Sequence, residues 1–158
     1  MRLLFLGGTR FLGRHAVEAA LARGHEVTLF TRGKTPQPFG GRVHALVGDR
    51  DPRVAPGIAA LEGGEWDAVI DTSGYVPRVV GASATLLAPR VGRYVFVSSL
   101  SVLAKPDRPG LDESAPLVAL DDPATEDVLA NYGGLKAACE AAVRDAFGAR
   151  ATLVRPGL

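Results

Sequence analysis

Apolar residues occur along the chain in short continuous runs, which alternate with longer segments where apolar and polar positions follow a helical period. The short runs are rich in Val, Leu and Phe and are bounded by Gly, Pro or charged residues, which is typical of buried strands. They predict six strands, at residues 3–7, 26–30, 43–47, 67–71, 93–99 and 151–155. The longer segments predict helices at 10–23, 77–88 and 125–147, and Gly24 is expected to end the first of them.

Strands separated by helices predict an α/β fold, a doubly wound Rossmann-type parallel sheet with strand order 3-2-1-4-5-6 and helices on both faces. The length of 158 residues is sufficient for one domain with a single core. Two long loops, at 31–42 and 101–125, follow predicted strands. We expect them at the carboxyl edge of the sheet, where ligands bind in folds of this type.

Charge and cysteine content narrow the class of protein. Charged residues make up 22% of the chain, the formal net charge is +1 and no basic run occurs, so we expect no nucleic-acid partner. The apolar start MRLLFLGG is too short for a signal peptide or a membrane span, so we expect a cytoplasmic protein with no membrane partner. The one cysteine, Cys139, is expected to pack within a helix, and we expect no metal site.

The segment GGTRFLG, residues 7–13, follows the first predicted strand and opens the first predicted helix. A dinucleotide-binding turn of the G-x-G-x-x-G type aims backbone N–H groups and a helix N-terminus at a pyrophosphate. Gly8 and Gly13 fit this pattern, but Arg10 occupies the middle glycine position. We assign the whole turn to cofactor binding, through Gly7, Gly8, Thr9, Arg10, Phe11, Leu12 and Gly13. The alternative is an ordinary strand-to-helix turn that binds no ligand.

The end of the second predicted strand bears on the choice of cofactor. In such sheets a carboxylate at this place binds the ribose hydroxyls of NAD, whereas an arginine accommodates the 2′-phosphate of NADP. Thr31 stands here, followed by Arg32 and Lys34, and no carboxylate is present. We therefore predict NADP as the preferred cofactor and NAD as the second candidate, with Arg10 reaching the same phosphate. Solvated surface cations are the alternative interpretation.

Asp49 follows the third predicted strand in the segment GDRD. Its carboxylate is a candidate to accept a hydrogen bond from the adenine amino group at the edge of the sheet. An Asx turn that leads into Pro52 is the alternative role.

Tyr132 and Lys136 are four residues apart in the last predicted helix, so their side chains lie on the same face about one turn apart. A phenol, with an ordinary pKa of about 10, exchanges protons poorly at neutral pH unless a nearby cation stabilises the phenolate. Ser98, Ser99 and Ser101 lie at the carboxyl edge where the fifth predicted strand ends, and a serine there can donate to a substrate oxygen while the tyrosine moves a proton. A chance pair on an exposed helix and simple serine caps are the alternatives.

Together these residues resemble the short-chain dehydrogenase/reductases, and within them the NAD(P)-dependent epimerase/dehydratase-like branch with its atypical members. The resemblance extends from GGTRFLG through DAVIDTSGY and YVFVSSLSV to YGGLK and LVRPG. It implies that Ser99, Tyr132 and Lys136 are catalytic and that Lys136 also binds the nicotinamide ribose. It further implies that Thr72 and Ser73 lie at the cofactor.

In the glycine turn, Gly7 and Gly13 match the branch's G-x-x-G-x-x-G pattern. The middle glycine is replaced by Arg10, as in atypical members that begin with GGTRF. The departure bears on the binding geometry more than on whether a dinucleotide binds.

The resemblance implies hydride transfer between a nicotinamide cofactor and a small-molecule carbonyl or alcohol, such as a sugar nucleotide. Members of this branch are about twice as long, so we expect that the C-terminal substrate domain is absent and that this piece binds cofactor but turns over little substrate. Members often pair through the helix that carries Tyr-x-x-x-Lys, which leaves a homodimer open. Two other classes stay open, a non-catalytic NADP-binding regulator and an RNA-binding relative.

Overall fold

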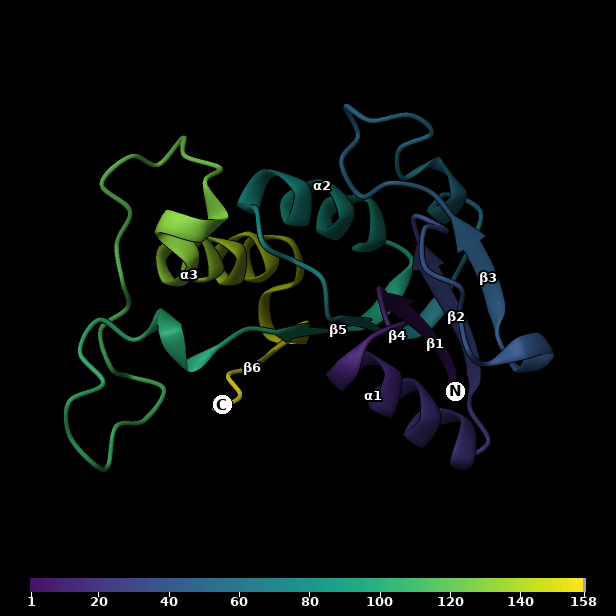
Figure 1. The fold of residues 1–158 in the computed structure, drawn as a ribbon, viewed down its shortest axis with the longest axis horizontal. Coiled ribbons are helices and arrows are strands. Elements are labelled where there is room, and N and C mark those ends of the chain that lie inside the picture. Colours follow the sequence, from purple (N-terminus) through teal and green to yellow (C-terminus); the bar gives the residue numbers. More distant parts are fainter. Residues whose placement is uncertain (158) are drawn as a thin grey trace.

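The computed structural model, which describes residues 1–157, contains one parallel sheet of six strands in the order β3-β2-β1-β4-β5-β6 (Figure 1). The order and the parallel pairing confirm the fold predicted from the sequence. The strands are β1 (Arg2–Leu6), β2 (Glu26–Thr31), β3 (His44–Val47), β4 (Trp66–Asp71), β5 (Val91–Val97) and β6 (Ala151–Val154).

Helices cover both faces of this sheet, as predicted. Helix α1 (Phe11–Ala22) lies on one face, and α2 (Pro77–Leu87) and α3 (Val128–Phe147) lie side by side on the other (Figure 1). Short 3-10 turns occur in the connections, namely η1 (Gly40–Arg42), η2 (Ala59–Leu61), η3 (Leu100–Val102) and η4 (Gly148–Arg150).

The observed bounds differ from the predicted ones by a few residues, and local capping explains the largest difference in α3, whereas the end of α1 is as predicted. Helix α3 begins at Val128 instead of residue 125, because the Asp127 carboxylate caps it by accepting from the backbone N–H groups of Leu129 and Ala130. Helix α1 ends before Gly24, which has a φ of 74° as expected of a residue just past a helix end.

The two faces of the sheet carry separate apolar cores, and β1 contributes to both. Leu4 and Leu6 face α2 and α3, whereas Leu3 and Phe5 face α1. A strand that is buried on both faces reads as a continuous apolar run, which is why LLFL has no polar alternation. Cys139 belongs to the first core as predicted, and burial raises the pKa of its thiol to about 12.

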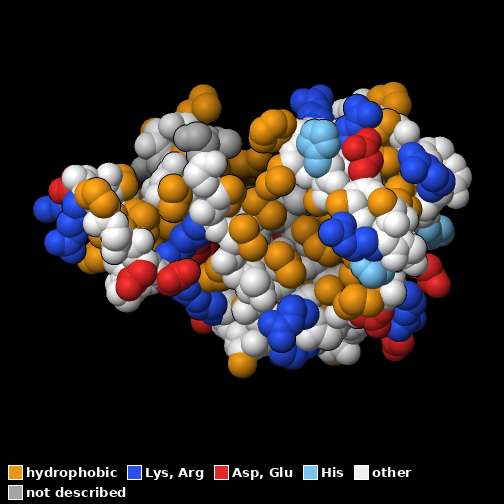
Figure 2. All heavy atoms as spheres, turned by 90° about the horizontal axis from the view of Figure 1, so that it is seen from below, with side chains coloured by type: hydrophobic (Ala, Val, Ile, Leu, Met, Phe, Trp, Pro, Cys, Tyr) orange, Lys and Arg blue, Asp and Glu red, His pale blue; other side chains and the backbone are white. Residues whose placement is uncertain are grey.

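Charges of both signs are interspersed on the molecular face shown in Figure 2, with apolar side chains between them. This face therefore carries no single basic patch. In residues 1–157, every helix is too short or too polar to cross a membrane.

Candidate functional site

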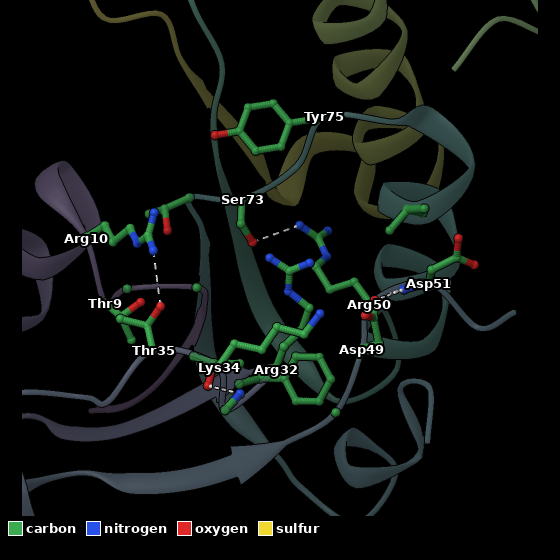
Figure 3. Close-up of a pocket in the computed structure, with 18 of the residues that line it drawn as sticks. Thr9, Arg10, Arg32, Lys34, Thr35, Asp49, Arg50, Asp51, Ser73 and Tyr75 are labelled. Carbon is green, nitrogen blue, oxygen red and sulfur yellow. Dashed lines mark hydrogen bonds between the residues drawn. The ribbon is translucent and has the colours of Figure 1, made fainter. Parts of the chain in front are cut away.

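A cavity of about 650 Å³ opens at the carboxyl edge of the sheet, above β1, β2 and β4. It brings together the glycine turn, the loop after β2, the start of the loop after β3 and the segment after β4 (Figure 3). The predicted cofactor residues in its wall are Gly7, Gly8, Thr9, Arg10, Thr31, Arg32, Lys34, Asp49, Thr72 and Ser73. At this volume the cavity is of the size that ligand sites have.

The glycine turn has the backbone geometry that a close approach to a phosphate requires. Gly7 and Gly8 have φ values of 97° and 93°, a region that side chains with a Cβ rarely adopt. A Cβ on Gly7 would lie 2.8 Å from Thr72 Oγ1, so the turn packs directly on the segment after β4. Helix α1 has neither a side-chain cap nor an acidic residue in its first turn, so its N-terminus suits an anion.

Arg10 stands where the pattern has glycine, and its backbone explains why this is tolerated. Its φ and ψ are −134° and 152°, an extended conformation open to any residue. The Arg10 guanidinium donates to Thr35 Oγ1 in the loop after β2, at 3.3 Å (Figure 3). The following residue, Phe11, carries the strain, with a φ of 37°.

Gly13 lies behind the turn, and its replacement gives a direct stability test. A Cβ at this position would lie 2.9 Å from Gly8 Cα, which is backbone and cannot yield without moving the turn. We expect Gly13→Ala to lower the free energy of unfolding by about 1–3 kcal/mol in urea denaturation. The matched control is Gly81→Ala in α2, where the new Cβ meets Ala142 at 3.7 Å. There the better helix propensity of alanine should stabilise by about 1 kcal/mol, and equal effects at the two sites would contradict the close packing.

Basic side chains gather at the end of the cavity near β2. Figure 3 shows Arg32 and Lys34 directed into it from the loop after β2. Among residues 1–157, neither they nor Arg10 lie within ion-pair distance of a carboxylate. Thr31 shapes this loop, since its hydroxyl accepts from the backbone N–H of Gly33 at 3.3 Å.

Asp49 lines the cavity and also forms the Asx turn that the sequence offered as an alternative. Its Oδ1 accepts from the backbone N–H of Asp51 at 3.0 Å. The two roles are compatible, because Oδ2 takes no part in this turn. Thr72 and Ser73 both donate their hydroxyl to the carbonyl oxygen of Leu6, at 3.2 and 3.1 Å, and so fix the segment after β4 to the end of β1.

Lys136 is almost fully buried beside this segment, although it was predicted to bind a ribose. Its ammonium donates to the carbonyl oxygens of Gly74, at 2.8 Å, and Val97, at 2.6 Å. It also lies 4.1 Å from the centre of the Phe96 ring. Burial lowers the pKa of Lys136 below its ordinary value. An ammonium has three hydrogens, so one remains for a further acceptor.

Tyr132 lies at the start of the regular part of α3, directly after a break at Asn131. Its ring is partly exposed, and its centre lies 6.4 Å from that of Tyr75. Tyr75 in turn lines the cavity and lies 5.5 Å from the Lys136 ammonium. Burial, with a contribution from Tyr132, raises the pKa of Tyr75. The predicted Tyr–Lys pair is therefore joined to the cavity through Tyr75.

Ser99 caps the turn η3 instead of ending β5, which stops at Val97. Its Oγ accepts from the backbone N–H of Ser101 at 3.1 Å and donates to the hydroxyl of Ser101 at 3.0 Å. Helix α3 packs closely on η3. The contact depends on Gly133, because a Cβ there would overlap the carbonyl oxygen of Ser101. Its neighbour Gly134 has no room either, since a Cβ would lie 2.6 Å from Leu120.

Several predicted residues do not line the cavity. Phe11 and Leu12 are exposed at the start of α1 and are not part of the cavity wall. Ser99, Tyr132 and Lys136 also lie outside the cavity wall. Among residues 1–157, no three His, Cys, Asp or Glu side chains are grouped to hold a metal ion.

Other residues of the cavity were missed by sequence reasoning, above all Arg50 and Tyr75. Both directly follow or lie near assigned residues, in GDRD and DTSGY, and an extension of the site along these loops would have included them. The missed residues of the wall are Phe30, Gly33, Thr35, Gly48, Arg50, Asp51, Tyr75, Val76 and Val79.

Known proteins with similar sequences are only partly covered by this chain. "Chloroplast stem-loop binding protein of 41 kDa b, chloroplastic" from Arabidopsis thaliana is 33% identical over 120 residues, which are 67% of this chain and 31% of that protein. A 3-beta-hydroxysteroid dehydrogenase from Mycolicibacterium neoaurum is 33% identical over 86 residues, 53% of this chain and 22% of that protein. The chain thus spans a third or less of these relatives.

Solved structures share the fold over nearly the whole chain. A UDP-galactose 4-epimerase matches with a TM-score of 0.73 at 22% identity, over 98% of this chain and 55% of that one. The Bordetella bronchiseptica enzyme WbmG in complex with NAD matches with a TM-score of 0.73 at 18% identity, over 98% and 52%. Residues 3–157 match the profile of the NAD dependent epimerase/dehydratase family, and the chain belongs to this family.

Proposed function

We propose that this chain is the cofactor-binding part of an oxidoreductase that transfers hydride between NADP and a carbon bearing oxygen in a small molecule. The observation that carries the proposal is the cavity at the carboxyl edge, bounded by an uncapped helix N-terminus and joined through Tyr75 to Tyr132 and Lys136. Membership of the NAD dependent epimerase/dehydratase family supports a nicotinamide cofactor.

The residues present fit a dinucleotide. The turn around Gly7 and Gly8 leaves no room for side chains where the backbone N–H groups of α1 would meet a pyrophosphate. Asp49 would accept from the adenine amino group, and the free hydrogen of Lys136 would bind a ribose hydroxyl. When bound, the cofactor supplies or accepts the hydride.

In reduction, Tyr132 would give its phenolic proton to the substrate oxygen, and in oxidation it would take that proton back. Lys136 would stabilise the phenolate through its charge. Ser99 would donate to the substrate oxygen as negative charge develops on it. UDP-galactose 4-epimerase and 3-beta-hydroxysteroid dehydrogenase are among the similar proteins, and both names fit a secondary alcohol or ketone as substrate class.

The preference for NADP rests on the three cations at the β2 end of the cavity. We expect Arg32→Met and Lys34→Met each to weaken NADPH binding about tenfold or more and to leave NADH binding nearly unchanged, because charged hydrogen bonds are worth about 1.5–3 kcal/mol. Titration of nicotinamide fluorescence with each variant measures this. The control is Arg14→Met, since Arg14 is an exposed residue of α1 paired with Glu18. A wild-type preference for NADH of tenfold or more would refute the NADP assignment.

The function itself is tested by titrating the chain with NADPH and NADH and then adding carbonyl substrates. We expect saturable cofactor binding and slow turnover. Failure of both cofactors to bind would contradict the proposal. Binding without any turnover in a longer chain that contains a substrate domain would favour a non-catalytic NADP sensor, although Tyr132 and Lys136 are both present here.

RNA binding is an alternative suggested by the name of the Arabidopsis relative. The near-neutral net charge argues against it, because phosphate contacts dominate affinity for RNA, and the face shown in Figure 2 carries charges of both signs. An RNA affinity that falls steeply with salt would support this alternative.

A further inference from the structure

Arg50, in the wall of the cavity, forms a largely buried charged pair with Asp71. The Arg50 guanidinium donates to both carboxylate oxygens of Asp71, at 2.7 and 2.8 Å. Its remaining terminal hydrogens point to Ser83 Oγ at 2.8 Å and Ser73 Oγ at 3.4 Å. The terminal nitrogens of Arg50 therefore have no hydrogen left for a cofactor phosphate, so Arg50 differs from Arg32 and Lys34 in what it can do.

Asp71 is fully buried at the end of β4 and accepts further hydrogen bonds. The Tyr94 hydroxyl donates to Oδ2 at 2.7 Å, and the backbone N–H of Ser73 donates to Oδ1 at 3.0 Å. The carboxylate thus holds the backbone that leaves β4. One residue later, the carbonyl oxygen of Gly74 accepts from the Lys136 ammonium. Consecutive contacts therefore join Arg50 to Lys136 through Asp71 and the backbone of residues 73 and 74.

The space around Gly74 shows that this segment cannot shift freely. A Cβ on Gly74 would lie 2.6 Å from the Phe96 ring, 2.8 Å from Val80 and 3.1 Å from Asp71 Oδ2. The same Phe96 ring lies beneath the Lys136 ammonium. The backbone that Asp71 holds therefore fixes the Lys136 ammonium on one side, through the carbonyl oxygen of Gly74.

Titratable groups on several elements face Lys136. Asp71 and Glu140 favour its charged form, and Arg50 opposes it. The groups that face it are Asp71 on β4, Arg50 in the loop after β3, Tyr75 in the segment after β4, and Cys139 and Glu140 on α3. Removal of Arg50 would leave the Asp71 carboxylate without its cation at the same moment as it loosens the segment that holds Lys136.

We propose that Arg50 is a positioning residue for Lys136, acting through its buried pair with Asp71 and through the backbone of residues 73 and 74. This extends the proposed function, on which the catalytic meaning of Lys136 rests. The pair would connect the adenine end of the cavity, next to Asp49, with the group that serves the proton transfer. A change at the adenine end of the cofactor site would then alter the position and the pKa of Lys136 at the other end.

The test follows the titration of Lys136 directly, in the chain without cofactor. The chain has only three lysines, Lys34, Lys105 and Lys136, so ¹³C labelling of lysine gives three side-chain signals, assigned by single removal of Lys34 and Lys105. We expect Arg50→Met to raise the titration midpoint of Lys136 by about one pH unit, because a nearby unpaired carboxylate favours the ammonium. Amide exchange at residues 72–74 should become faster in the same variant.

Two further variants separate positioning from general damage. Arg50→Lys keeps the positive charge but loses the two parallel hydrogen bonds of the guanidinium to Asp71. We therefore expect a smaller shift in the titration midpoint of Lys136, with amide exchange at residues 72–74 still faster than in the wild type. It also keeps the test usable where Arg50→Met does not fold. Arg150→Met removes another arginine, one that donates to the carbonyl oxygens of Ala88 and Val91, and should leave Lys136 unchanged.

The proposal is overturned if Lys136 titrates as in the wild type in the folded Arg50 variants, or if Arg150→Met moves it equally. Because no cofactor is used, failure of NADP to bind would remove the proposed function and leave this result standing. If the titration midpoint of Lys136 shifts but neither cofactor binds, Arg50 and Lys136 are coupled structurally and the proposed function is wrong.

Discussion

Replacement of Tyr132 by phenylalanine is expected to lower turnover by about 100-fold or more while the affinity for NADPH stays within about twofold of the wild type. Only the hydroxyl group is lost, so the ring still packs near Tyr75 and the cavity keeps its shape. The measurement is the single-turnover oxidation of bound NADPH by a carbonyl substrate, followed by nicotinamide absorbance.

The matched control for this change is Tyr75→Phe. Tyr75 is also a partly exposed tyrosine, it lies on the wall of the same cavity, and it is not part of the Tyr-x-x-x-Lys motif. We expect it to keep most of the rate. If Tyr132→Phe remained active and Tyr75→Phe did not, the proton donor would have been assigned to the wrong tyrosine of the pair.

The second large effect concerns stability and arises from Glu140 on α3. Its side chain is fully buried and accepts two hydrogen bonds from Arg155, at 2.9 and 2.7 Å, just past β6. We expect Arg155→Met, which removes both hydrogen bonds from this buried carboxylate and leaves it only Arg144 at 3.7 Å, to lower the free energy of unfolding by about 3–5 kcal/mol in urea denaturation. Arg144→Met is the control, because Arg144 is half exposed and lies 3.7 Å from the same carboxylate. Arg144→Met should lower the free energy of unfolding by less than about 1 kcal/mol. An equally small loss for Arg155→Met would show that the pair of Glu140 and Arg155 contributes little to stability.

The same carboxylate gives the fold a pH dependence with a defined sign. Burial opposes ionisation of Glu140, but the hydrogen bonds and charge of Arg155 prevail and hold its pKa below the ordinary value. A carboxyl whose pKa is lower in the folded than in the unfolded state stabilises the fold above its unfolded pKa. We expect this contribution to be lost as the pH falls below about 4. Urea denaturation at a series of acidic pH values gives the free energy of unfolding as a function of pH. This free energy should change less with pH for Glu140→Gln than for the wild type.

The sheet could be predicted from the sequence because its strands are short and its inner strands, such as β1 and β4, are largely buried. Runs such as LLFL and DAVID have no room for a polar alternation, and the helices between them leave only a crossover topology. The ends of the helices and strands were predicted less well, since they depend on single side chains. Asp127 sets the start of α3, and β5 stops at Val97 because the chain turns into η3, which Ser99 caps.

Those residues of the cavity wall that lie near the strand ends could be predicted because their places follow from the sheet. The pair of Arg50 and Asp71 could not, because the two residues are 21 positions apart in the chain and their strands are not neighbours in the sheet. Neither could the burial of Lys136 between two carbonyl oxygens. Such contacts depend on how loops from separate strands pack, which periodicity does not report.

The two glycines between Tyr132 and Lys136 show that the Tyr-x-x-x-Lys motif also requires small residues at these two positions in this fold. Gly133 and Gly134 are the two places where α3 touches the serine turn and Leu120 without any intervening side chain. A Tyr-x-x-x-Lys segment with larger residues at these places would keep the helical spacing of its ends and still hold its tyrosine away from the serine. In this architecture, the two glycines inside YGGLK help to determine whether the tyrosine, the lysine and the serine can meet a common substrate.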